Sequence, residues 1–223
     1  MQPATRQRGR PARTECAMSR EHLIRQAFNA FAVHGYDGVS LRQLAAACGV
    51  SDSLLHHHFG SKQELWREAA DQVIGPLMQR LYETLEQLAL QGDAASTIRR
   101  NLPQSLKLVL AEPYAVEFMF REGEPANERG EYMRATYMRP YLQRLDVLFQ
   151  QAVAEGQFNP FPPLHRDVLV MGFLRSLVIP GILQVELAGH LATAEARSAF
   201  IDQMVEVLFT GFTRRPVSSG DPS

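Results

Sequence analysis

Residues 39–66 read VSLRQLAAACGVSDSLLHHHFGSKQELW, and this stretch decides the fold. Apolar side chains recur at helical spacing over residues 41–48, which predicts a helix of about two turns. Gly49 stops this helix, because glycine adopts the left-handed conformation after a last turn without steric cost. Ser51 can cap a further short helix that continues to Phe59. Two short helices joined by a tight glycine turn have the outline of a helix-turn-helix, an outline that other helical hairpins share.

Serine residues mark helix starts on both sides of this turn. Ser40 and Gln43 have the spacing of a capping box, in which the two residues satisfy each other's orphan amides. Ser61 and Glu64 repeat that spacing at the start of a following helix. Together with an earlier helix, residues 19–73 are therefore expected to form four helices with very short connections.

The rest of the chain also has helical periodicity and no alternating strand pattern. An apolar face over residues 24–31 predicts the first helix, and Gly75-Pro76 predicts a break or kink in the fourth. Later helices are expected over residues 77–90, 94–111, 113–121, 131–154, 164–188 and 194–213. The sequence therefore predicts an all-α fold.

The charge of the chain is asymmetric. Residues 1–62 hold eight Lys or Arg and four Asp or Glu, a net charge of +4, and the remainder holds 15 bases and 20 acids, a net charge of −5. A basic first quarter indicates that one end meets a polyanion, although a solubilising tail would have the same charge. Residues 1–18 are expected to be a disordered arm, and its segment Arg8-Gly9-Arg10-Pro11 resembles the core of a minor-groove-binding AT-hook. A non-specific electrostatic arm fits these residues equally well.

Composition excludes several classes of protein. Apolar residues make up 45% and charged residues 21% of the 223 residues, which is the balance of a globular chain. Cys16 and Cys48 are too few for a disulfide framework, and no secretory leader precedes them, so we expect a cytoplasmic protein. The most apolar stretch, residues 168–187, is interrupted by charged residues and proline, which argues against a membrane span. No phosphate loop, nucleophile elbow or metal-ligand motif is present, so no cofactor, metal or catalytic residue is expected.

Several landmarks in and beside residues 39–66 stand at fixed spacing. They are Gly35, Ser40, Leu44-Ala45, Gly49-Val50-Ser51, Leu55, His58-Phe59, Ser61-Lys62 and Leu65. In these landmarks the chain closely resembles the DNA-binding domain of the TetR family of bacterial transcriptional regulators. The resemblance implies an N-terminal three-helix helix-turn-helix DNA-binding domain over residues 19–66. It also implies a C-terminal helical domain for effector binding and dimerisation over 67–213, followed by a disordered tail over 214–223.

The same resemblance implies a function. Members of this family are homodimers that bind double-stranded operator DNA, and a small-molecule effector in the C-terminal domain releases them. We therefore expect a homodimeric repressor with an unknown, small and largely apolar effector and no membrane partner. A transcriptional activator of the same fold is the alternative. An enzyme built on a helical bundle is a second alternative, for which the sequence carries no catalytic motif.

Candidate DNA contacts lie in the two short helices and at the start of the fourth. A helix in the major groove needs small or hydrogen-bonding side chains, and Arg42 and Lys62 stand at helix starts where they can meet phosphate. The expected contacts are Ser40, Arg42, Gln43, Ser51, Asp52, Ser53, Leu54, His56, His57, His58 and Lys62. Asp52 either accepts a hydrogen bond from a cytosine amino group or stabilises the N-terminus of its helix by its negative charge. The family usually has tyrosine where this chain has His56.

The histidine run could indicate a metal site or DNA contacts. Consecutive helical residues diverge by about 100° each, so His56, His57 and His58 do not share the face that a metal pair needs. We expect His56 and His57 to face DNA and His58 to pack beside Phe59, while one of the two preceding leucines packs inward. Because histidine gains charge as the pH falls from about 7.5 to 5.5, operator affinity should rise over that range.

Aromatic and methionine side chains crowd residues 113–141, which hold four of the six tyrosines. Some are expected to line a ligand cavity, although each alone is more often ordinary core. The expected ligand contacts are Tyr114, Phe118, Met119, Tyr137, Met138, Met171 and Phe173. The last two predicted helices carry more apolar surface than a thin bundle hides, which predicts a dimer interface. The expected interface residues are Val178, Ile182, Val205, Leu208 and Phe212.

Overall fold

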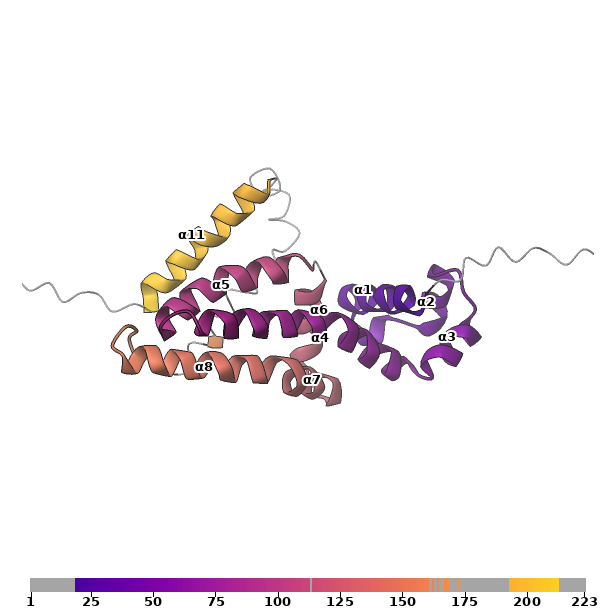
Figure 1. Ribbon diagram of the computed structural model, residues 1–223. Helices are drawn as coiled ribbons and strands as arrows, with labels where there is room; N and C mark the ends of the chain where they lie inside the picture. The colour runs from indigo at the N-terminus through magenta and orange to yellow at the C-terminus, as the bar shows by residue number, and fades with distance from the viewer. Residues whose placement is uncertain are drawn as a thin grey trace, which may run out of the picture.

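The computed structural model describes residues 19–112, 114–160, 162, 164, 167, 168, 172 and 193–212. These residues confirm the all-α fold (Figure 1). The predicted arm over 1–18, the predicted tail over 214–223 and most of the helix predicted over 164–188 lie outside the described residues. So do the predicted site residues Met171, Phe173, Val178 and Ile182 and the side chain of Phe212.

Four helices form the end of the molecule that holds the helix-turn-helix. They are α1 (Arg20–Gly38), α2 (Leu41–Ala47), α3 (Asp52–Phe59) and α4 (Lys62–Ala89). Each follows a serine whose side-chain oxygen accepts from a backbone N–H three residues later, namely Ser19, Ser40, Ser51 and Ser61. These caps fix the helix starts, because the first amides of a helix have no partner inside it. The predicted capping box is complete at Ser61, whereas at Ser40 the structure gives only the bond to the serine oxygen.

Two glycines with positive φ set the geometry around α2 and α3. Gly35 (φ 71°) interrupts α1 near its end, and Gly49 (φ 67°) makes the turn between α2 and α3. A side chain with a Cβ would be strained at either position. Cys48 beside the turn is buried, and burial raises the pKa of its thiol. This cysteine is therefore part of the core and is not a reactive group.

The prediction at Gly75 and Pro76 was a break or a kink, and the structure excludes the break because the fourth helix is continuous through both residues. Pro76 removes one helical hydrogen bond, but the following turns carry Leu77 and Leu81, which are buried in the core and hold the helix in place. The domain boundary predicted between residues 66 and 67 lies inside α4, and one hydrophobic core continues across it.

The second half of the described chain surrounds α4. Its helices are α5 (Ala94–Leu110), α6 (Ala115–Gly123), α7 (Glu128–Met133), the π-helical turn η1 (Arg134–Met138), α8 (Arg139–Ala154) and α11 (Ala194–Phe212). The helix predicted over 131–154 thus begins earlier, at Glu128, and contains a π-turn. Pro140 is the second residue of α8, which follows the π-turn directly.

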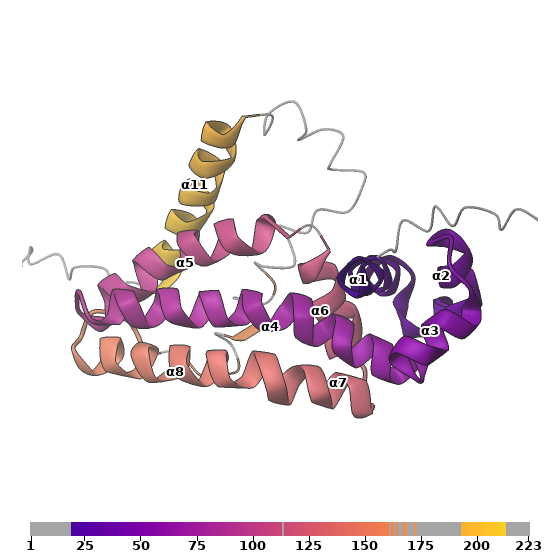
Figure 2. The same cartoon turned by 45° about the vertical axis from the view of Figure 1, so that its right-hand side comes forward.

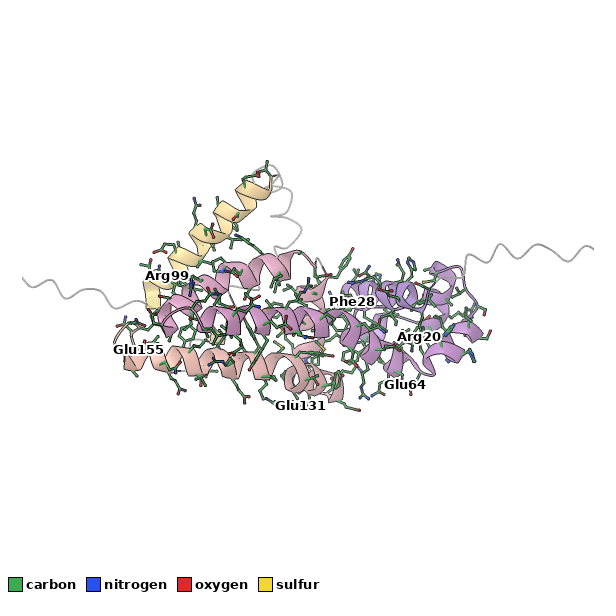
Figure 3. All side chains as sticks on the ribbon, in the orientation of Figure 1. Arg20, Phe28, Glu64, Arg99, Glu131 and Glu155 are labelled. Atoms are coloured by element: carbon green, nitrogen blue, oxygen red, sulfur yellow. The ribbon has the colours of Figure 1, made fainter. Side chains whose placement is uncertain are left out.

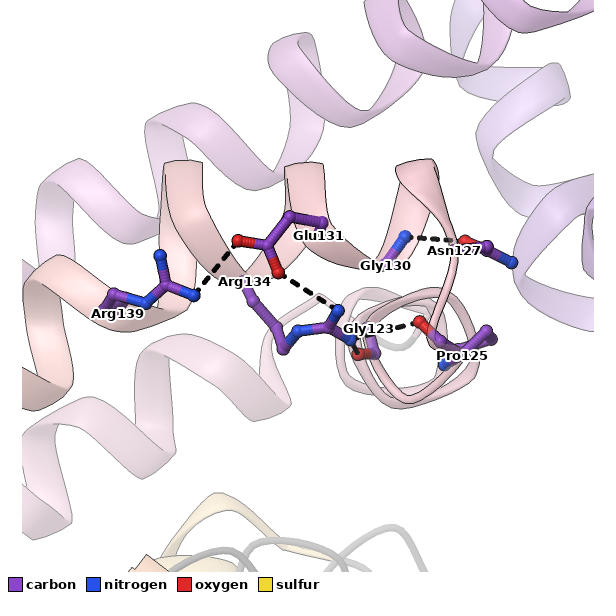
Figure 4. A network of polar contacts seen from close by, with 7 residues as sticks. All are labelled: Gly123, Pro125, Asn127, Gly130, Glu131, Arg134 and Arg139. Carbon is purple, nitrogen blue, oxygen red and sulfur yellow. Dashed lines mark hydrogen bonds and ion pairs between the residues drawn. The ribbon is translucent and has the colours of Figure 1, made fainter.

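A polar network fixes the start of α7 (Figure 4). Asn127 caps the helix, and Arg134 donates to carbonyl oxygens at the end of α6 and in the loop after it. Glu131 accepts from Arg139 and Arg134, and these hydrogen bonds lower the pKa of its carboxyl group. The network therefore ties the end of α6 to the start of α8.

The helices pack around two cores. One core joins α1 to α4 with α6 and α7, and the other joins α5, α8, α11 and the far part of α4. Figure 2 shows α4 running between α5 and α8, with α6 against α1 and α11 leaning across α5. None of the described helices combines the length and the apolar character that a membrane span needs.

Candidate nucleic-acid interface and internal cavity

The outward face of α3 is polar and exposed. Leu55 is fully buried and Phe59 nearly so, whereas Leu54 is 38% exposed, so Leu55 is the leucine that packs inward. The predicted contacts in and just before this helix are all exposed; they are Ser51, Asp52, Ser53, Leu54, His56, His57 and His58. Such a face can meet the edges of base pairs, and the Leu54 side chain can contact a thymine methyl group.

Two of the histidines differ in their surroundings. The Nδ1 atom of His56 donates to the carbonyl oxygen of Gly60 at 3.0 Å, and its Nε2 atom lies 4.0 Å from the Asp52 carboxylate. His56 therefore closes the C-terminal end of α3. His57 and His58 have ring contacts, 5.7 Å apart between their own centroids and 6.0 Å from His58 to Phe59, and neither hydrogen-bonds to a described residue. The ring nitrogen atoms of both histidines therefore stay available to DNA.

Cations flank α3 on both sides. Within the described chain, Arg42 on α2 is exposed and has no hydrogen-bond or ion-pair partner. Lys62 at the start of α4 places its Nζ atom 4.2 Å from the Tyr36 ring centroid, and no acidic residue in the described ranges pairs with it. Arg20 instead forms an ion pair with Glu68 of α4, and Arg25 forms one with Glu112, just after α5. Arg42 and Lys62 are therefore the cations here that can neutralise phosphate without breaking an ion pair.

The start of α4 is less open to anions than its sequence suggests. The Glu64 side chain already accepts from the Ser61 backbone N–H at 2.8 Å, as part of the capping box. Figure 3 places Glu64 in the half of the molecule that holds Arg20, away from the end that holds Arg99. The expected phosphate contact at this point therefore depends on the Lys62 ammonium more than on free amides.

A cavity of about 110 Å³ lies inside the second half of the molecule. This is several times the space that one water molecule needs. Its wall comes from α4, α5, α6, η1, α8 and α11 and is almost entirely apolar; Met78, Leu81, Val116, Phe120, Leu145 and Phe149 are among the lining residues. Met119 and Met138, two of the expected ligand contacts, also line it.

Three polar side chains interrupt this apolar wall. Asn101 and Ser105 stand one turn apart on α5, and Tyr141 faces them from α8. The Asn101 amide donates to the Tyr141 hydroxyl at 2.9 Å, and Ser105 Oγ donates to Asn101 Oδ1 at 3.2 Å. The Ser105 and Tyr141 oxygens are 3.0 Å apart. Asn101 and Ser105 are buried, and burial raises the pKa of Tyr141.

The other described residues that the sequence predicted as ligand contacts do not line this cavity. Phe118 stacks on Phe28 of α1 at 4.6 Å between centroids and also on Trp66, so it belongs to the core between the two halves. Tyr137 is buried and donates to Asp71 of α4; burial, followed by this carboxylate, raises its pKa well above the ordinary tyrosine range. Tyr114 is 40% exposed and is not part of the cavity wall. Helical spacing alone does not show which face of a helix meets the cavity.

Two of the expected interface residues are also placed differently. Val205 is 4% exposed and packs in the second core, and Leu208 lines the cavity. The side of α11 that carries Val205 and Leu208 packs against α5, so both side chains point into the interior of the same chain. Val207, on the opposite side of α11, is 72% exposed.

Helix α6 connects the cavity to the helix-turn-helix end. Met119 and Phe120 line the cavity, whereas Glu122 on the next turn is 4% exposed and accepts from the Tyr36 backbone N–H at 3.0 Å. Arg129 pairs with Glu122 at 3.4 Å and stacks over the Tyr36 ring at 3.7 Å. A shift of α6 would therefore disturb the end of α1, next to Lys62.

Sequence reasoning missed the polar triad and the role of Glu122. A signal for the triad was present, because Asn101 and Ser105 are polar residues at i and i+4 on a helical face that also carries Ile98, Leu102 and Val109. No local signal shows that Glu122 is buried, since its partner Tyr36 is 86 residues away.

Comparisons with known proteins agree with this architecture. The family model described as bacterial regulatory proteins, tetR family, matches residues 23–69. The HTH-type transcriptional regulatory protein RaaS of Mycobacterium tuberculosis is 48% identical over 214 residues, covering 84% of this chain and 92% of RaaS. The HTH-type transcriptional repressor AcnR of Corynebacterium efficiens is 42% identical over 48 residues, which are 22% of this chain and only 26% of AcnR.

A solved structure extends the likeness in fold beyond the helix-turn-helix. A TetR-family regulator from Streptomyces coelicolor A3 superposes with a TM-score of 0.67 at 23% identity, covering 86% of this chain and 91% of that chain. These relatives and neighbours are transcriptional regulators, not enzymes. Since RaaS is matched over nearly its whole length, this chain belongs to the TetR family of bacterial regulatory proteins.

Proposed function

We propose that this chain is a DNA-binding transcriptional regulator, a homodimeric repressor that a small molecule releases from its operator. The observation that carries the proposal is the outward face of α3, which is polar, exposed and flanked by Arg42 and Lys62 without acidic partners. Such a helix can enter the major groove while the two cations hold phosphates on either side.

A homodimer fits this interface. Two copies of α3 would enter successive major grooves about 34–36 Å apart, which doubles the number of contacts. The exposed Val207 side of α11 supports an interface there. Val207→Asp should yield a folded monomer, because the substituted side chain is exposed in the single chain, whereas Val205→Asp should unfold the chain. Sedimentation that shows Val207→Asp still dimeric would exclude this interface.

Repression and release have separate support. AcnR, which shares the helix-turn-helix region, is named a repressor. The internal cavity offers a place for an effector, and α6 lies between that cavity and the Tyr36 end of α1. An effector that favours one position of α6 would shift the protein toward a conformer with a different spacing of the two α3 helices. The effector can shift this equilibrium only by the difference between its binding free energies for the two conformers, typically about 1–3 kcal/mol.

Salt-dependent DNA binding tests the proposal. Fluorescence anisotropy would measure affinity for duplex DNA from upstream of the protein's own gene over a series of salt concentrations. Arg42→Gln and Lys62→Gln should each weaken binding and reduce the log–log salt slope by about one per subunit. Arg99→Gln is the matched control, because Arg99 pairs with Glu206 at the opposite end of the molecule. If all three variants lost affinity equally, the interface would lie elsewhere.

A further inference from the structure

The polar triad in the cavity wall forms a closed ring of hydrogen bonds. Asn101 donates to Tyr141, and Ser105 donates to Asn101. Ser105 has then used its one proton, so the Tyr141 hydroxyl donates across the remaining 3.0 Å to Ser105. Each of the three side chains donates once and accepts once, which explains why these polar groups can be buried without a ligand.

The ring still leaves hydrogen-bonding capacity for a guest molecule. One N–H of Asn101 and a lone pair on each of the three oxygens remain unused. A single hydroxyl group can donate to one of these lone pairs, and a single carbonyl group can accept from the Asn101 N–H. The triad is thus suited to one small oxygen group and does not offer several donors to an anion.

The rest of the wall disfavours charge. No lysine, arginine, histidine, aspartate or glutamate is present among the described lining residues. Two arginines of the described part of this half are engaged elsewhere, because Arg144 pairs with Glu86 and Arg99 pairs with Glu206. Burial keeps Tyr141 neutral by raising its pKa. A carboxylate or ammonium group would enter this cavity without an opposite charge, which is strongly unfavourable.

We propose that the cavity binds an uncharged, apolar molecule whose single hydroxyl or carbonyl oxygen is held by Asn101, Ser105 and Tyr141. This inference rests on the proposed function, in which the cavity is the effector site. It goes further, because it excludes acids and amines as the buried part of the effector and names the side chains that hold its polar group.

A matched series of eight-carbon probes tests the inference. Ligand-observed NMR would measure binding of octan-1-ol, octan-2-one, octanoate and octylammonium to the full chain, with fluorescence of Trp66, the one tryptophan, as a second signal. The two neutral probes should bind at least about tenfold more tightly than either ion. Equal or tighter binding of an ion, or no binding of the neutral probes at millimolar concentration, would overturn the inference.

Two substitutions test the triad and the charge argument separately. Asn101→Leu removes the one free donor of the triad and should weaken the binding of octan-2-one by about fivefold. Gln104→Leu makes the same change on the exposed side of α5 and should leave binding unchanged. Leu142→Lys places a cation in the wall and should reverse the preference toward octanoate, a result that does not depend on the folding of Asn101→Leu.

Unchanged octan-2-one binding in folded Asn101→Leu, or an unchanged preference in folded Leu142→Lys, would contradict the assignment. DNA binding is measured without any probe. A chain that binds DNA but prefers octanoate would therefore refute only the ligand class, whereas a chain that binds no DNA would refute the proposed function.

Discussion

Glu122 should stabilise the junction between the cavity and the helix-turn-helix, and Glu122→Ala tests this directly. The change leaves the Tyr36 amide without its acceptor and Arg129 without its carboxylate. An orphaned amide costs about 1–3 kcal/mol, and loss of a fully buried ion-pair partner costs about 3–5 kcal/mol. Arg129 keeps its contact with the Tyr36 ring and is 22% exposed, so the full penalty does not apply. We expect a total loss of about 3 kcal/mol, which corresponds to a melting temperature lower by roughly 6–12 °C.

Glu117 provides the matched control on the same helix. It pairs with Arg121, but both side chains are more than 40% exposed, so Glu117→Ala should cost less than about 1 kcal/mol. Calorimetry at one fixed protein concentration would compare the variants, because the melting of a dimer depends on concentration. Glu122→Gln keeps an acceptor for the Tyr36 amide, so its melting temperature should lie between those of Glu122→Ala and Glu117→Ala. If Glu122→Ala melted at the same temperature as Glu117→Ala, the buried carboxylate would contribute nothing to this junction.

Three further predictions follow from the structure. Leu54→Ala should weaken DNA binding, measured by anisotropy, at unchanged stability, whereas Leu55→Ala should lower the free energy of unfolding in urea by about 2–5 kcal/mol. Equal losses of stability in the two variants would contradict the outward position of Leu54 and the inward position of Leu55. His57→Ala should weaken DNA binding at unchanged stability, since the exposed imidazole on α3 can hydrogen-bond to DNA, and unchanged affinity by anisotropy would exclude this contact. The hydrogen bond from Arg144 lowers the pKa of the Glu86 carboxyl group in the folded protein. The pair therefore stabilises the fold at pH values above the ordinary glutamate pKa of about 4.3, and this stabilisation is lost as the pH falls through the lowered pKa. Glu86→Gln should therefore shift the urea midpoint at pH 7 more than at pH 3, and an equal shift would refute the assignment.

The helix-turn-helix was predictable from the sequence because its signals are local. A serine caps each helix through an amide three residues away, and Gly49 turns the chain by its own conformation. The exposed face of α3 follows from the same information once Leu55 is placed inward. The continuity of α4 was not predictable, because burial of Leu77 and Leu81 in the core decides it and the local preference of Gly75-Pro76 does not.

The cavity and the junction depend on pairings that no local pattern contains. The triad forms only because α8 brings Tyr141 to α5, and Glu122 is buried only because α6 packs on α1 beside the interruption at Gly35. For the same reason Phe118 was assigned to a ligand site although it stacks on Phe28 and Trp66. Aromatic side chains at helical spacing predict burial, and only tertiary packing decides whether the neighbour is a cavity or another helix.

Selection from a random-sequence duplex library tests the central claim, that α3 reads DNA sequence from both subunits of a dimer. The account predicts enrichment of one inverted repeat, whose half-site centres lie about 10–10.5 base pairs or a multiple of this apart. Leu54→Ala and Arg42→Gln proteins, selected in parallel, should recover weaker enrichment of the same repeat. Recovery of no common sequence by the parent protein, despite folded dimers and salt-dependent binding, would contradict the claim that α3 is a sequence-reading helix.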